Sequence, residues 1–160
     1  MTAATATPTP AVTVRNLMHT PAVAVGPGAR VADAVRLLNE QRVGAAAVVD
    51  DAGQLVGMIT ERDVLHAAGT GADPSTIEVS AIMTRSPVTI DAEDSAAPAL
   101  ALFSSNRFRH LPVLDAGSVV GILSIRHVVR VAHIEEVKPA GSAPQLAPAG
   151  LEGVAVAETG

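Results

Sequence analysis

The sequence predicts a mixed α/β (α+β) fold in which two tandem β-α-β-β-α repeats pack together as a pseudo-two-fold pair. The main observation is an internal repeat, because three segments recur in the same order at an offset of 64 to 66 residues. The matched pairs are 14–25 with 79–90, 42–50 with 107–115, and 55–64 with 119–128. The second observation is size. A half of about 60 residues would bury only about 60% of its unfolded surface alone, so the two halves should pack on each other.

Within the first repeat, apolar periodicity and turn residues predict each element. A Gly-Pro-Gly turn at 26–28 ends a short apolar strand, and apolar residues at helical spacing over 31–38 predict a helix. The Asp-Asp-Ala-Gly segment at 50–53 predicts a hairpin turn between two apolar strands. The expected elements are a strand at 22–25, a helix at about 30–41, strands at 45–49 and 55–59, and a helix from 60 to about 68.

The second repeat shows the same pattern. Pro98 falls in the first turn of its first helix, where a missing N–H group is tolerated. The expected elements are a strand at 88–90, a helix at about 95–105, strands at 110–114 and 119–123 around a turn at 115–118, and a helix at about 125–137.

The domain boundaries follow from this repeat and from composition. We expect the first repeat to cover 12–72 and the second to cover 73–137. The Thr/Ala/Pro-rich residues 1–11 and the Pro/Ala/Gly-rich residues 138–160 are expected to be disordered tails, because such segments bury too little apolar area to offset chain ordering. No remaining stretch is long enough to form another domain, which predicts a stand-alone protein.

Composition excludes several classes of function. The chain has no Cys, so disulfides, thiolate chemistry and cysteine-based metal sites are excluded. With a net charge of −5, the chain lacks the overall positive charge that is typical of proteins that bind nucleic acid or an anionic membrane. The first ten residues lack the features of a secretory signal, and no apolar stretch approaches a membrane span, so we expect a cytoplasmic protein. The basic residues are ten Arg and the single Lys138, which with the abundant Ala suggests a GC-rich, bacterial genome.

The repeated segments resemble the CBS domain pair, also called the Bateman module. The likeness rests on a Met…Pro opening at 17–21 and 82–87, an apolar strand ending in Asp at 46–50 and 111–115, and a Gly-h-h-Thr/Ser-x-x-Asp junction, in which h is an apolar residue. It covers about residues 12–132, and the tandem recurrence of these segments is more specific than any one of them.

The resemblance implies a regulatory module rather than an enzyme. Many such modules bind AMP, ADP, ATP or S-adenosylmethionine between the repeats, and we expect such a regulatory ligand here, with no required cofactor. Others bind nothing and act as dimerisation or interaction scaffolds. In both cases we expect a homodimer, a disk of four repeats paired through apolar helix faces such as Val128, Val129, Val131 and Ala132, and a partner protein of unknown identity. No nucleophile–base pair can be assembled from the sequence, and the histidines lack metal-ligand spacing.

Thr60 and Asp63 are the first candidate binding residues. In the resemblance, Thr60 contacts a phosphate and Asp63 accepts hydrogen bonds from ribose hydroxyls. A carboxylate suits a vicinal diol, and a helix N-terminus suits an anion. Thr at the N-cap with an acid three residues later also forms a capping box, which stabilises a helix start without any ligand. In the second copy Ser124 keeps the hydroxyl but His127 replaces the Asp, so we expect that cleft to be impaired for adenosine ligands.

In the resemblance, the other repeat completes the Asp63 cleft. It contributes Pro87 and Val88, the segment containing Phe108, Arg109 and His110, and the basic Arg126 as a phosphate-facing residue. Alternatively, Arg107 and Arg109 form a solvated edge and His110 is a hydrogen-bonded strand histidine. The charge difference between the repeats favours a binding role for Arg109 and His110, because the equivalent segment 43–45 of the first repeat carries no charge. Only two aromatic residues occur, and we expect Phe103 in the core and Phe108 near the cleft.

Overall fold

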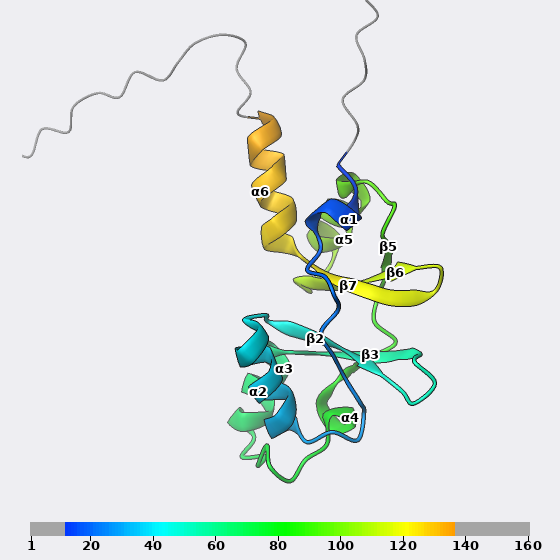
Figure 1. Ribbon diagram of the computed structural model, residues 1–160. Coiled ribbons are helices and arrows are strands. Elements are labelled where there is room, and N and C mark those ends of the chain that lie inside the picture. Colours follow the sequence, from blue (N-terminus) through cyan, green and yellow to red (C-terminus); the bar gives the residue numbers. More distant parts are fainter. Residues whose placement is uncertain (1–11, 137–160) are drawn as a thin grey trace, which may run out of the picture.

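The computed structural model describes residues 12–136, and the predicted tails at 1–11 and 138–160 lie outside these residues (Figure 1). The predicted order of strands and helices is confirmed in both repeats. The first contains α1 (Val14–Leu17), β1 (Ala24–Val25), α2 (Val31–Gln41), β2 (Ala45–Val49), β3 (Leu55–Thr60) and α3 (Glu61–Gly69). The second contains α4 (Val79–Ile82), β4 (Thr84–Arg85), β5 (Ile90–Asp91), α5 (Ala96–Ser105), β6 (His110–Asp115), β7 (Ser118–Ser124) and α6 (Ile125–Glu136). The short elements α1, α4 and β4 are additions to the predicted pattern.

Each repeat builds a small sheet, and the opening segment of the other repeat extends it. In the first sheet the order is β1-β2-β3-β4, so a strand from the second repeat lies at its edge. Thr84 and Arg85 pair with Met58 and Gly57 of β3. In the second sheet, β5-β6-β7, the same place is taken by His19, whose backbone N–H and carbonyl both bond to Ile122, at 2.9 and 3.1 Å. The two repeats have therefore exchanged their opening segments.

The hydrophobic cores are exchanged in the same way. Val14, at the start of α1, is fully buried in the core of the second repeat with Phe103 and Leu123. Val79, at the start of α4, is fully buried in the core of the first repeat with Leu38. Apolar burial is the main favourable contribution to folding, so each half depends on the other for its own core.

Two glycines explain how closely the opening segments approach. A Cβ on Gly57 would lie 2.6 Å from the Met83 sulfur, and a Cβ on Gly121 would lie 2.6 Å from the Met18 sulfur. The equal distances show the pseudo-two-fold relation between the repeats. Glycine at the start of the Gly-h-h-Thr/Ser junction is therefore required by packing, whatever the chain binds.

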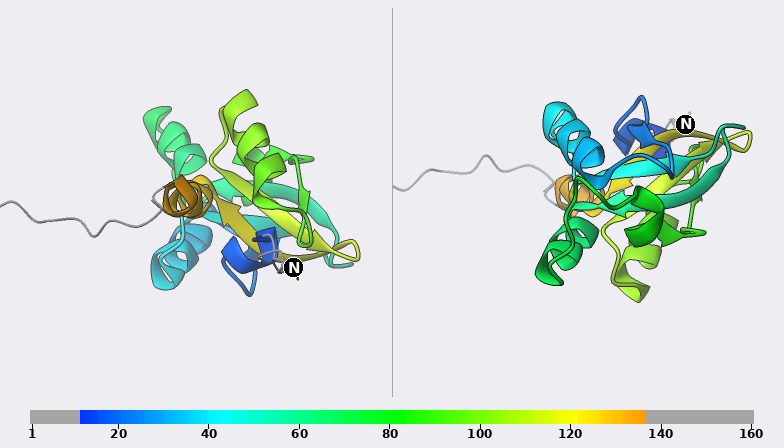
Figure 2. Two further views of the ribbon diagram at one scale, coloured as in Figure 1. Left: turned by 90° about the horizontal axis from the view of Figure 1, so that it is seen from above. Right: turned by 90° about the horizontal axis from the view of Figure 1, so that it is seen from below.

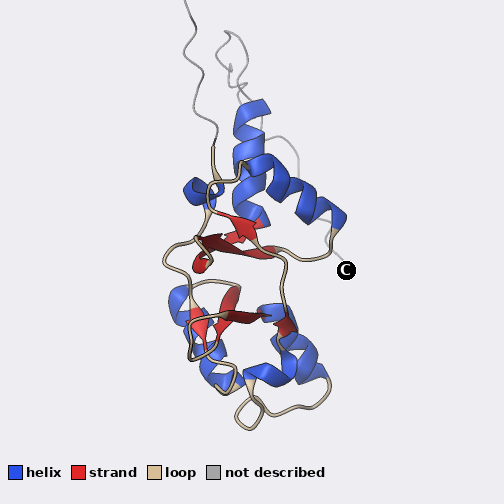
Figure 3. Ribbon diagram, turned by 90° about the vertical axis from the view of Figure 1, so that its right-hand side faces the viewer, coloured by secondary structure: helices blue, strands red, loops and turns tan. Residues whose placement is uncertain are grey.

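The two sheets face each other in the middle of the molecule, and the helices lie on their outer sides (Figure 3). Between the sheets, Ala45 and Met58 pack against Ile122. The β2–β3 and β6–β7 hairpins extend to the same side (Figures 1 and 2). Both β-to-α junctions, at Thr60 and Ser124, consequently lie at the other end of the strands. In the described part of the chain, no helix is both long enough and apolar enough to cross a bilayer.

Candidate functional site

The junction between β3 and α3 contains the predicted Thr60 and Asp63. Oδ2 of Asp63 accepts hydrogen bonds from the backbone N–H and from Oγ1 of Thr60, at 2.8 and 2.7 Å. The backbone N–H of Asp63 lies 3.4 Å from the Thr60 hydroxyl and donates to it. The capping box that the sequence allowed as an alternative is therefore present. All the hydrogen bonds between the Asp63 carboxylate and described residues use Oδ2, which leaves Oδ1 for another donor.

The equivalent junction between β7 and α6 is built differently. Ser124 Oγ accepts one long hydrogen bond, 3.4 Å from the backbone N–H of Arg126. His127 takes the place of Asp63, and its Nδ1 is buried without a hydrogen-bond partner among the described residues. A buried ring nitrogen without a partner is unfavourable, so this junction lacks the well-satisfied carboxylate of the first one.

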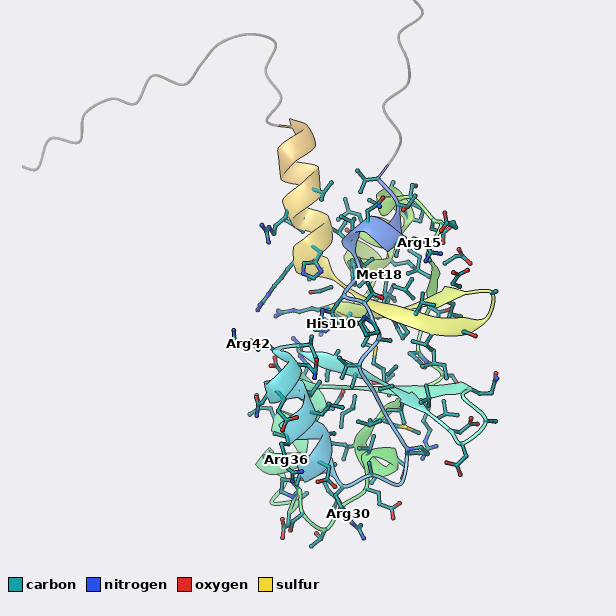
Figure 4. The ribbon with its side chains drawn as sticks, viewed as in Figure 1. Arg15, Met18, Arg30, Arg36, Arg42 and His110 are labelled. Carbon is teal, nitrogen blue, oxygen red and sulfur yellow. The ribbon has the colours of Figure 1, made fainter. Side chains whose placement is uncertain are left out.

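His110 lies between the two repeats, close to charged residues from both (Figure 4). A Cβ on Gly44 would lie 3.2 Å from Glu61 Oε2 and 3.4 Å from His110 Nε2, so both side chains meet over this glycine. Burial lowers the pKa of His110 below its ordinary value, and the nearby Glu61 carboxylate opposes this effect. Arg126, Arg109 and His127 lower the pKa of His110 further. The backbone also places Arg109 and His110 near Arg126, because His110 pairs with Ser124 and the N–H of Ile125 donates to the Arg109 carbonyl at 2.9 Å.

A cavity of about 330 Å³ opens beside this cluster, and both repeats line it. We call it the arginine cavity. Arg62 comes from the first turn of α3, next to Asp63, whereas Arg107, Phe108 and Arg109 lead into β6. The remaining lining residues are Phe103, Asn106 and Ile125. The structure thus brings the first turn of α3 to the basic segment before β6.

The two aromatic residues lie against each other. Phe103 is buried in the second core, as predicted, with 4% of its surface exposed. Phe108 is half-buried, and its ring stacks edge-on against Phe103 with the centroids 6.1 Å apart. Phe108 therefore forms one wall of the arginine cavity and is held there by the core.

Pro87 and Val88 are not among the residues that line the arginine cavity. Because β3 and β4 are antiparallel, with Met58 opposite Thr84, the chain after Thr84 runs away from Thr60. The backbone N–H of Ser86 already bonds to Val56, four residues or about 13 Å of strand from Thr60. Pro87 and Val88 then lead into β5, which runs parallel to β6 with Ile90 opposite Val113. Their assignment to the Asp63 cleft stays a prediction.

Glu61 and Arg62 were not predicted from the sequence as site residues. Glu61 is equivalent to the apolar Ile125 in the second repeat, so a comparison of charge between the copies singles it out. Arg62 is equivalent to Arg126, which the sequence had already marked as a candidate. Applying the same criterion to both copies would have found it.

Another cavity, of about 570 Å³, is less suited to a charged ligand. It is lined mainly by small and apolar residues of the 18–24 segment, the first hairpin and β7. Its one charged lining residue, Arg15, is paired with both Glu93 and Asp115 at 2.7 Å. Within residues 12–136, no group of three or more His, Asp or Glu side chains is placed to hold a metal ion.

Comparison with known proteins gives a consistent result. The family model described as "CBS domain" matches residues 14–69 and 79–134. The CBS domain-containing protein YhcV of Bacillus subtilis is 33% identical over 113 residues, which are 70% of this chain and 79% of YhcV. The chain also matches CBSCBSPB3 of Arabidopsis thaliana with 32% identity over 143 residues, 88% of this chain, but spans only 26% of that longer protein.

Two solved structures share both fold and sequence with this chain. The CBS-domain containing protein ATU1752 from Agrobacterium tumefaciens is 32% identical with a TM-score of 0.69, covering 76% of this chain and 94% of its own. CBSX2 from Arabidopsis thaliana, solved in complex with AMP, is 32% identical with a TM-score of 0.65, covering 78% of this chain and 98% of its own. Since the family model matches both repeats and the repeat architecture agrees with these structures, the chain belongs to the CBS domain family and carries two CBS repeats in tandem.

Proposed function

We propose that this chain is a non-catalytic regulatory module that binds an adenosine nucleotide between its two CBS repeats and signals its presence to a partner protein. The observation that carries the proposal is that the first turn of α3 meets Arg109 at the arginine cavity and His110 over Gly44, with Arg126 nearby. The AMP complex of CBSX2, at 32% identity, supports an adenosine ligand.

Each residue has a defined role in this proposal. Asp63 keeps its Oδ2 on Thr60, as the helix cap requires, and offers Oδ1 to a ribose hydroxyl. The N-terminus of α3 and the side chains of Arg109 and Arg126 attract the phosphate, and His110 donates a ring N–H to it. Phe108 supplies an aromatic wall. Helix capping and ligand binding by Asp63 are then compatible, because a carboxylate has two acceptor oxygens.

A second candidate function is a ligand-free dimerisation scaffold, which the exposed apolar side chains on the helices favour. Leu65 on α3 is 74% exposed, Val129 on α6 is 44% exposed and Leu100 on α5 is 38% exposed. Of the α6 residues predicted to pair two chains, Val128 belongs to the second core instead, with 2% exposed, and the side chain of Ala132 lies outside the described set. A homodimer through these helices is proposed for either function. We also propose that the protein acts in the bacterial cytoplasm, with no nucleic acid or membrane partner.

A thermal-shift titration of the full chain with AMP, ADP, ATP and S-adenosylmethionine tests the proposal. Ligand at a hundredfold excess over its Kd adds about 2.7 kcal/mol to the free energy of unfolding. We expect Asp63→Ala to abolish the shift and His127→Ala to keep it, each measured against the same variant without ligand. No shift with any of the four compounds would contradict ligand sensing. In that case, a ligand-independent dimer in analytical ultracentrifugation would support the scaffold.

A further inference from the structure

The arginine cavity concentrates positive charge in a chain of net charge −5. Its lining includes Arg62, Arg107 and Arg109 but no acidic residue. Among the described residues, the ion pairs involve Arg15, Arg30 and Arg36, so none of the three cavity arginines is neutralised by a carboxylate at salt-bridge distance. All three arginines are solvent-exposed. Like charges that line one cavity repel each other and are stabilised by a bound polyanion.

This charge is continuous with the proposed phosphate site. Arg109 lines the cavity and also lies close enough to His110 to affect its ionisation, as does Arg126. The basic surface therefore extends from Arg126 through Arg109 into the cavity, past the His110 imidazole, whose pKa is lowered. One phosphate can occupy only part of this surface, because a phosphate group is matched by one or two guanidinium groups.

The pseudo-two-fold relation between the repeats shows that the group of three arginines occurs at only one of the two equivalent junctions. The repeat offset places Arg42 and Gly44 at the positions of Arg107 and Arg109. The corresponding place beside Arg126 therefore lacks one of the three arginines. Neither the pseudo-symmetry of the repeats nor a need for solubility explains why all three arginines occur only at the junction next to Asp63.

We infer that the preferred ligand of this module carries two or more phosphates, and that Arg62 and Arg107 bind the terminal ones in the arginine cavity. This inference rests on the proposed function and specifies its ligand class as a nucleoside diphosphate or triphosphate. The first phosphate lies beside His110 and Arg126, and Arg109 lies between the two subsites. S-Adenosylmethionine, which carries a positive sulfonium, is disfavoured by the same charges.

The preference for a ligand with two or more phosphates is tested by isothermal titration calorimetry on the full chain. The ligands are AMP, ADP, ATP and S-adenosylmethionine, in buffer without added divalent cations. We expect ATP to bind at least tenfold more tightly than AMP, and S-adenosylmethionine more weakly than AMP. Arg62→Gln and Arg107→Gln should each weaken ATP binding at least fivefold while changing AMP binding less than twofold. Arg36→Gln is the matched control, because Arg36 lies on α2 and pairs with Asp33 (Figure 4).

Equal affinities for AMP and ATP, or equal losses for both nucleotides in the Arg62 and Arg107 variants, would overturn the inference. A comparable loss of ATP binding in Arg36→Gln would also overturn it, because the effect would then reflect net charge alone. Inorganic tripolyphosphate separates this inference from the proposed function. If no adenosine compound binds, the proposed function fails, and tripolyphosphate binding that depends on Arg62 and Arg107 still upholds the anion subsite. Absence of that binding then overturns the subsite too.

Discussion

Replacement of Gly121 by alanine should destabilise the protein, because the opening segment of the first repeat lies directly against this glycine. The added Cβ would lie 2.6 Å from the sulfur and 2.9 Å from Cγ of Met18, and 2.8 Å from the carbonyl oxygen of His19. The Met18 side chain can move aside, but the His19 carbonyl is held by its hydrogen bond from Ile122. Overpacking of this kind typically costs about 1–3 kcal/mol, and we expect the upper half of that range because backbone must shift.

Urea unfolding of the purified variant measures this cost. Gly57→Ala should cost a similar amount, since its Cβ would meet Met83 and the Thr84 carbonyl oxygen at 2.6 and 2.9 Å. Gly28→Ala is the control, because a Cβ there meets nothing within 4 Å, and its effect should stay within about 0.5 kcal/mol. A Gly121→Ala variant as stable as Gly28→Ala would refute the exchange of opening segments.

Two further predictions concern the site without ligand. Asp63→Ala should lower the free energy of unfolding by about 0.5–2 kcal/mol through loss of the capping box, and Ser124→Ala, which loses one 3.4 Å contact, should cost less. If the two variants lost equal free energy of unfolding in urea, the greater stability assigned to the Asp63 capping box would be contradicted. Because the folded-state pKa of His110 is lowered, the neutral imidazole stabilises the fold above pH 6.5, and this contribution is lost as the pH falls below that value. The urea midpoint of His110→Gln should therefore fall less than that of the wild-type protein between pH 6.5 and about pH 5, and an unchanged pH profile would contradict the assigned role of burial.

The sequence was sufficient to predict the elements of each repeat, because their signals are local. The apolar spacing of α2 and the turn of the β2–β3 hairpin depend on neighbours within a few residues. The exchange of the opening segments was not predictable, because 14–18 and 79–83 have the same pattern and would fit either sheet. Charge differences between the copies, by contrast, singled out His110, and the structure brings its side chain beside Glu61 of the other repeat.

The exchanged cores also restrict how a bound ligand can act. Moving the repeats apart would expose Val14 and Val79, both fully buried in the opposite repeat, and would break the strand pairs of both opening segments. A ligand shifts an equilibrium only by its difference in affinity for the two states. A ligand that opened the pair would have to offset the loss of this buried apolar surface and of these strand pairs. We therefore expect a nucleotide to change the positions of α3 and α6, whose first turns frame the site, rather than to open the pair. Leu65 and Val129, exposed on these same two helices, are then the residues through which a partner or a second copy would detect the change.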